Sequence, residues 1–169
     1  HLRPGAPRRH QPDVAVTARP DQRYSPSLPW ADAVSADVDL ADILSMARTR
    51  SLRSVATDAM WNELMHYART RPRPEWRPPY RFRWIGGHVT AWDVEWLYHL
   101  PFPFACCELF DMRMHEIVHR GHRIKPAVID HADEILSMLS SIGFSHEARG
   151  EVVRIWGYEP KTYDDFPPA

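Results

Sequence analysis

The chain has little cysteine, little lysine and no long hydrophobic run. Its two cysteines, Cys106 and Cys107, are adjacent and cannot form an ordinary disulfide framework. No apolar run approaches the roughly 20 residues that a membrane span needs, and the first residues are rich in proline and arginine instead of apolar residues. We therefore expect a cytoplasmic protein with no membrane partner.

A large excess of charge of one sign is absent as well. The 21 basic and 22 acidic residues give a formal net charge of -1, so the chain as a whole is not attracted to nucleic acid. We expect no nucleic-acid partner. Lys125 and Lys161 are the only lysines, and we interpret the preference for arginine as the codon composition of a GC-rich genome.

The distribution of proline divides the chain into segments. The first 30 residues contain six of the 16 prolines and almost no apolar periodicity, which predicts that ordering them costs more than it gains. We expect residues 1–36 to be a disordered tail and residues 37–56 a short helix or linker. Residues 57–160 are predicted to form a single α+β domain, and residues 161–169 a C-terminal tail.

Apolar residues recur at helical spacing in three segments. The first is 37–50. The second is 58–69, for which Thr57 is the expected N-cap, and the third is 130–141, which Gly143 is expected to close.

Alternation of apolar and polar residues predicts strands elsewhere. The expected strands are 80–84, 92–100, 106–113 and 151–158, with a hairpin of 115–119 and 122–125 around Arg120 and Gly121. The fold class is therefore α+β, with an antiparallel or mixed sheet of four to six strands. We expect the 57–69 and 130–141 helices on one side of that sheet.

The segment 92–100 alternates most clearly. Trp92, Val94, Trp96 and Tyr98 are predicted on the buried face of a strand. Asp93, Glu95 and His99 then share the polar face, where a loop through 85–91 would set Arg83 against Asp93 and Arg81 against Glu95.

Two interpretations of that polar face remain open. Two close carboxylates can perform acid–base chemistry, as in glycoside hydrolysis, and Asp93, Glu95, His99 and Glu108 are the candidate catalytic residues. The preferred interpretation is cross-strand ion pairing on a solvated face. Glu108 and Asp111 alternate onto different faces of their strand, so we do not expect all four acids to converge.

The run from His115 to His119 fits H-E-x-x-H, the zinc-protease signature. That chemistry needs a helix, because in a strand the two histidines stand about 13 Å apart. Gly121 and Pro126 leave little room for a helix, so a strand is predicted. The alternative is a looser zinc site, for which the candidate ligands are His115, His119, His122 and His131. No cofactor is expected otherwise.

Aromatic and arginine side chains are the candidates for binding a protein partner. Arg154 and Trp156 share one face of the last strand, where they could stack or anchor a partner. Trp92 and Trp96 complete this candidate set. For Trp156 the competing interpretation is packing in the core.

Five motifs follow one another along the chain: Met60-Trp61-Asn62-Glu63-Leu64, Trp92-Asp93-x-Glu95-Trp96-x-Tyr98-His99, Glu108-Leu109-Phe110-Asp111, Arg120-Gly121 and Val153-Arg154-Ile155-Trp156-Gly157-Tyr158. Their order resembles domain-of-unknown-function family 6678, over about residues 57–158. The resemblance implies a small bacterial protein and no established reaction.

Two functions remain open. One is a non-enzymatic module that binds another protein, as an immunity or accessory factor does. The alternative is a metal-dependent or carboxylate-based hydrolase. A concave pocket that gathers the carboxylates would favour the enzyme, and an exposed surface would favour the binding module.

Overall fold

The computed structural model describes residues 14–15, 24–36, 38–72 and 76–169. Within them the elements follow the order β1 (Val14–Ala15), β2 (Val34–Ser35), α1 (Leu40–Thr49), β3 (Arg53–Ser54), α2 (Asp58–Arg69), β4 (Tyr80–Trp84), η1 (Phe104–Cys106), β5 (Cys107–Arg113), β6 (His115–Val118), β7 (Ala127–Asp130), α3 (Ala132–Ile142), β8 (His146–Arg149), β9 (Val152–Trp156) and β10 (Tyr158–Glu159). No helix in these ranges combines the length and the apolar character needed to cross a membrane.

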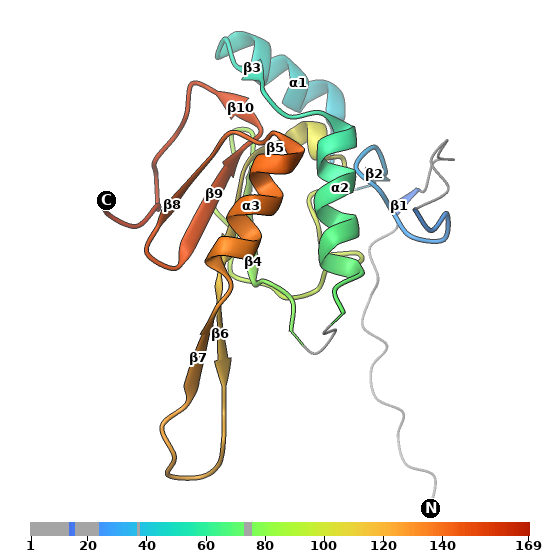
Figure 1. Cartoon of the computed structure of the whole chain (residues 1–169). Coiled ribbons are helices and arrows are strands. Elements are labelled where there is room, and N and C mark those ends of the chain that lie inside the picture. The colour runs from blue at the N-terminus through green and yellow to red at the C-terminus, as the bar shows by residue number, and fades with distance from the viewer. Residues whose placement is uncertain (1–13, 16–23, 37, 73–75) are drawn as a thin grey trace, which may run out of the picture.

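The main sheet is antiparallel and has the strand order β4-β5-β9-β8. Helices α2 and α3 lie side by side on one face of it (Figure 1). The α+β class, the four-stranded sheet and the position of both helices are therefore confirmed.

The three predicted helices begin and end close to the expected residues. The side chain of Asp39 caps α1 by accepting from the backbone N–H of Asp42, and Thr57 caps α2 by accepting from Met60. Gly143 ends α3 with a φ of 99°, a conformation that glycine adopts at little cost. The predicted Thr57 cap and Gly143 end thus placed the start of α2 and the end of α3 correctly.

Successive residues of each strand in the main sheet point to two faces that differ in what covers them. Residues facing the helices form the main aromatic core, in which Trp61 of α2 contacts Phe104, Phe110 and Phe144. The opposite face, which we call the second face, carries a smaller apolar cluster of Leu109, Val152, Trp156 and Phe166, together with charged side chains.

The prediction of a strand at 92–100 is wrong. Asp93 forms an isolated bridge with Tyr80 of β4 instead of a strand ladder. Val94, expected to be buried, is 63% exposed. The carboxylates of Asp93 and Glu95 accept from nearby backbone N–H groups. Local bonds of this kind compete with a strand ladder, so the alternation belongs to a loop.

The terminal segments that the structure describes pack against the domain. Residues 1–13 and 16–23 lie outside the described residues, but Tyr24 and Trp30 are buried in the main core. Phe166 is buried in the cluster of the second face. Residues 24–36 and the predicted C-terminal tail are therefore anchored to the domain by aromatic side chains, which the emphasis on proline content overlooked.

The predicted hairpin after residue 114 has a different second strand. β6 pairs with β7, from His115 opposite Asp130 to Val118 opposite Ala127. The second strand therefore begins after Pro126 instead of ending before it, since proline lacks the N–H that a ladder requires. Residues 119–126 form the connecting loop.

Candidate functional site

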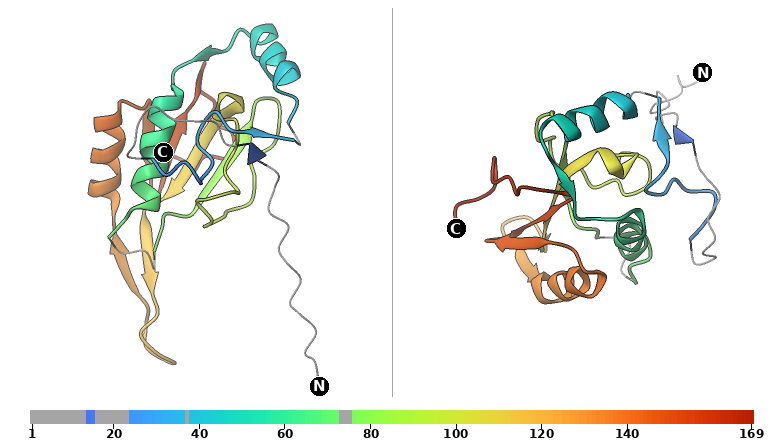
Figure 2. Two further views of the ribbon diagram at one scale, coloured as in Figure 1. Left: turned by 90° about the vertical axis from the view of Figure 1, so that its right-hand side faces the viewer. Right: turned by 90° about the horizontal axis from the view of Figure 1, so that it is seen from above.

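Strands β6 and β7 project from the body of the domain as a two-stranded arm (Figures 1 and 2). We use "arm" for residues 115–130 and "arm loop" for residues 119–126. Neither strand belongs to the main sheet. Four residue pairs at about 3.3 Å per step give the strands a length of about 13 Å, which extends these side chains away from the core.

One face of the arm carries an apolar pair that is open to solvent, next to the pair of His115 and Asp130. Ile117 and Val128 are cross-strand partners that are 61% and 62% exposed, and Ile124 in the arm loop is 56% exposed. A β-branched pair stabilises a ribbon where the two side chains touch. Their remaining exposed area is available for contact with another molecule.

The arm loop concentrates positive charge. Arg120, Arg123 and Lys125 are exposed, as are His119 and His122. The sequence has no aspartate or glutamate between Glu116 and Asp130. The overall charge of -1 therefore conceals a local charge of about +3 beside the apolar pair.

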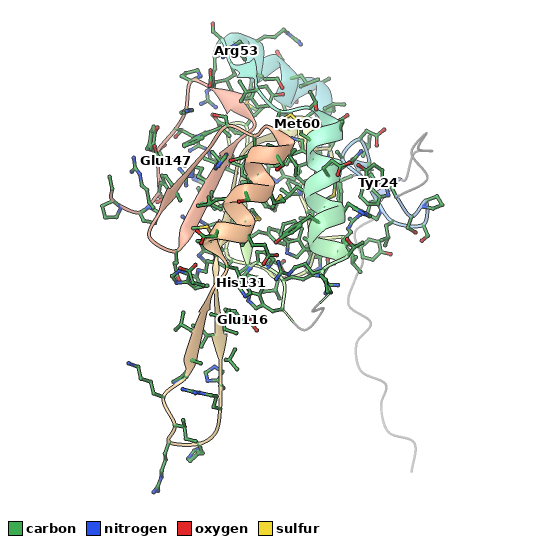
Figure 3. All side chains as sticks on the ribbon, viewed as in Figure 1. Tyr24, Arg53, Met60, Glu116, His131 and Glu147 are labelled. Atoms are coloured by element: carbon green, nitrogen blue, oxygen red, sulfur yellow. The ribbon has the colours of Figure 1, made fainter. Side chains whose placement is uncertain are left out.

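A polar contact secures the base of the arm (Figure 3). The Oε2 atom of Glu116, on the face opposite Ile117, lies 2.8 Å from Nε2 of His131, and Glu116 is only 7% exposed. The ring of Trp76 stacks on the imidazole with the centroids 4.3 Å apart. Because His131 immediately precedes α3, this contact ties the arm to the helical layer.

The contact continues into the space between α2 and α3. Glu134 lies 3.6 Å from Nδ1 of His131 and accepts from the hydroxyl of Tyr67, which in turn accepts from Arg71. Burial and the bond to Glu134 raise the pKa of Tyr67. Burial alone would raise the pKa of Glu134, but the bonds from Tyr67 and Arg71 lower it. Glu134 thus stays ionised and Tyr67 stays a donor, beside a cavity of about 330 Å³.

Asp93, Glu95 and His99, three of the four catalytic candidates, come together in one loop. Asp93 accepts from the N–H groups of Val94 and Glu95, and Nδ1 of His99 lies 2.9 Å from its carboxylate. Partial burial would raise the pKa of Asp93, but these bonds hold it below its usual range. The carboxylates therefore stabilise the loop, and the arginines expected opposite them bind elsewhere.

Glu108, the fourth catalytic candidate, lies on β5. A bulge between the pairs Arg83–Leu109 and Trp84–Cys107 interrupts the alternation of this strand. Glu108 consequently reaches Arg83 at 3.0 Å and Arg50 at 2.9 Å. The prediction that Glu108 and Asp111 occupy different faces is wrong, since Asp111 binds Arg81 on the same face of β4.

The four candidate metal ligands are spread along the arm. His115 on β6 lies 3.5 Å from Asp130, His119 and His122 are in the arm loop, and His131 binds Glu116 at the base. The strand predicted for 115–119 is confirmed for His115–Val118, and His119 follows it in the arm loop. Across the described ranges, no three histidine, cysteine, aspartate or glutamate side chains are grouped so that they could hold a metal ion.

The candidate partner-binding residues do not form an exposed surface. Trp96, Arg154 and Trp156 are at most 2% exposed, and Trp92 lies beneath the guanidinium groups of Arg81 and Arg113. A contact with a partner requires accessible area, and in this conformation these three residues have almost none, since Arg154 and Trp156 are engaged with the C-terminal residues. For Trp156, the core interpretation is the one that its burial supports.

Sequence reasoning missed the arm as a binding surface. Its apolar pair is visible only once the register of Ile117 against Val128 is known. Its charge had a readable signal, because 13 consecutive residues, 117–129, contain two arginines, one lysine and no acid.

The geometry defines an α+β domain with a four-stranded antiparallel main sheet, two helices that cover one of its faces and a projecting arm with a basic loop. The model of the family described as "Family of unknown function (DUF6678)" matches residues 43–162. The chain belongs to this family, and the match extends beyond 57–158 at both ends. No curated protein and no solved structure is significantly similar to it.

Proposed function

We propose that the chain is a non-enzymatic protein-interaction module of the bacterial cytoplasm, and that its arm binds an acidic surface of a partner protein. The observation that carries this proposal is the combination of exposed Ile117 and Val128 with the cationic arm loop on one projecting element. This form of binding suits an immunity or accessory factor.

The two kinds of side chain contribute differently to such an interface. Burying Ile117, Ile124 and Val128 would supply about 1.5–3 kcal/mol for each side chain that becomes fully covered. The arginines and the lysine of the arm loop would accelerate association with an acidic patch and orient the arm on it. An apolar centre beside a charged rim is typical of protein interfaces.

The hydrogen bonds and ion pairs that the candidate acidic residues already form support a non-enzymatic role. Asp93 and Glu95 accept from backbone N–H groups, and Glu108 is held between two arginines. A general acid or base must be within reach of a substrate proton. A protein is preferred over nucleic acid as partner because phosphates provide no contact for the apolar pair.

Site-specific photocrosslinking in cells of the source organism tests the proposal. A photoreactive phenylalanine replaces Val128 in one variant and Val94, which is 63% exposed, in the matched control. We expect a discrete protein adduct from position 128 only. The adduct should disappear when Arg120, Arg123 and Lys125 are all replaced by glutamate.

Three results would contradict the proposal. These are adducts to nucleic acid, the same adducts from positions 94 and 128, and no adduct from position 128. Circular dichroism of the triple-glutamate variant is the control for folding, which we expect to be unchanged because all three residues are exposed.

A further inference from the structure

Side chains on the second face of the sheet bind the C-terminal segment, residues 161–169. Backbone carbonyls of this segment accept from the sheet: Thr162 from Arg154 and Trp156, Asp164 from Arg154, Asp165 from Arg81 and Pro167 from Arg149. Because these donors bind backbone carbonyls, the five hydrogen bonds do not depend on which side chains the segment carries.

One aromatic ring anchors the segment. Phe166 is 9% exposed and packs against Leu109, Val152 and Trp156. The guanidinium groups of Arg149 and Arg154 each lie 4.7 Å from the centre of its ring. The side chain of Asp164, in contrast, is 75% exposed and lies 3.3 Å from Arg83. The segment is therefore held by one buried ring and by several polar contacts that water could replace.

The face beneath the segment carries an excess of positive charge. Asp111 is shared by Arg81 and Arg154, the latter through two bonds of 2.8 and 3.0 Å. Glu108 is similarly shared by Arg50 and Arg83. Arg149 and Glu147 of β8 form a further pair at 2.7 Å on this face. Five guanidinium groups thus face three carboxylates, and the carboxylate of Asp164 supplies a fourth negative charge. An acidic chain complements this face.

Open space adjoins the anchored ring. A cavity of about 460 Å³ is lined by Phe166 and Pro167 of the segment and by Arg81, Trp92, Arg113 and Glu151 of the domain, among others. The acidic residues on its wall are Glu151, which is 3.6 Å from Nε of Arg113, and Asp165. A peptide longer or bulkier than residues 162–167 has room to enter here.

We propose that the second face is a peptide-binding groove, which the chain's own residues 162–167 occupy as an intramolecular ligand. The ligand in trans is an extended acidic segment of a partner protein with one aromatic residue, similar in chemistry to Asp164-Asp165-Phe166, which displaces the C-terminal segment. The groove residues Arg81, Arg83 and Arg154 lie inside the matched family range, whereas the occupying Asp-Asp-Phe lies outside it. This surface is separate from the arm.

Fluorescence anisotropy with the full chain tests the groove. The probe is a labelled synthetic peptide with the sequence of residues 161–169. Phe166→Ala removes the intramolecular anchor, so we expect this variant to bind the peptide at least ten-fold tighter than the wild type does. A peptide with alanine in place of its phenylalanine, or with both aspartates changed to asparagine, should bind at least ten-fold more weakly than the parent peptide.

A second variant guards against loss of folding in the first. Asp164→Lys changes an exposed side chain and repels the intramolecular segment from Arg83, and it should increase peptide binding to a smaller extent. The triple-glutamate variant of the arm should bind the peptide as the wild type does, which separates this test from that of the arm. Equal affinity of the wild type and both folded variants for the peptide, or binding by none of them, would overturn the groove.

Discussion

The two faces of the β4-β5-β9-β8 sheet are built from alternate residues of the same strands, yet they are covered in different ways. On β9, Val153 and Ile155 face the helices, while Arg154 lies on the second face with Asp111. The first face is covered by helices through a large cluster of apolar and aromatic side chains. The second is covered by the C-terminal segment through guanidinium groups and one ring. Alternation thus sorts residues between faces without specifying what covers each face.

The helix-covered face should be the most sensitive to truncation. Trp61→Ala would open a cavity among Phe104, Phe110 and Phe144, so we expect a loss of about 3–5 kcal/mol in the free energy of unfolding. Urea denaturation followed by circular dichroism measures it. A loss below about 1 kcal/mol would mean that the two faces do not differ as described.

The second face should respond to loss of charge instead of loss of volume. Asp111→Asn keeps the shape of the side chain but leaves the buried Arg154 without its carboxylate. We expect a loss of about 3 kcal/mol in the free energy of unfolding, measured by guanidinium-chloride denaturation. Asp133→Asn, at an exposed site on α3, is the control and should change stability by less than about 0.5 kcal/mol. Similar losses of unfolding free energy in both variants would show that the buried Asp111–Arg154 pair contributes no more to stability than an exposed carboxylate does.

Removal of the ring that covers the second face should cost less than either change. Phe166→Ala should lower the free energy of unfolding by about 2 kcal/mol, because the segment can detach without leaving a closed cavity. Hydrogen exchange should show loss of protection at the backbone amide of Phe166, which donates to the carbonyl of Tyr163, and no loss in α2 or α3. Val94→Ala, a change at an exposed side chain outside the segment, is the control and should leave this protection unchanged. Loss of protection throughout the helices would place the segment in the core instead.

The smallest effect is expected in the loop that contains Asp93, which belongs to neither covering layer. The pKa of the Asp93 carboxyl is lowered in the folded state. Its contribution to stability is therefore present above the pKa of the unfolded state and is lost as the pH falls through the folded pKa. The difference in melting temperature between the wild type and Asp93→Asn should therefore be largest near about pH 7 and vanish toward about pH 2. A difference that does not change with pH would contradict this origin.

The success of the sequence predictions followed the range of the interactions involved. The Asp39 and Thr57 caps and the left-handed Gly143 act within one helical turn, and the helices that they delimit were predicted correctly. The strand prediction at 92–100 failed because the carboxylates of Asp93 and Glu95 bind backbone N–H groups of their own segment, which forms a loop. The H-E-x-x-H run was assigned to a strand correctly, since the nearby glycine and proline exclude a helix.

The sequence by itself determined the α+β class, the three helices, most strands of the main sheet and the concentration of positive charge at 117–129. Only the tertiary structure decided that Ile117 meets Val128, that Glu116 meets His131, and that a bulge turns Glu108 toward Arg83. It also decided that Tyr24, Trp30 and Phe166 anchor the terminal segments. Helix caps and periodicity depend on neighbours a few residues away, whereas register, bulges and aromatic anchors depend on partners that only the folded chain brings together.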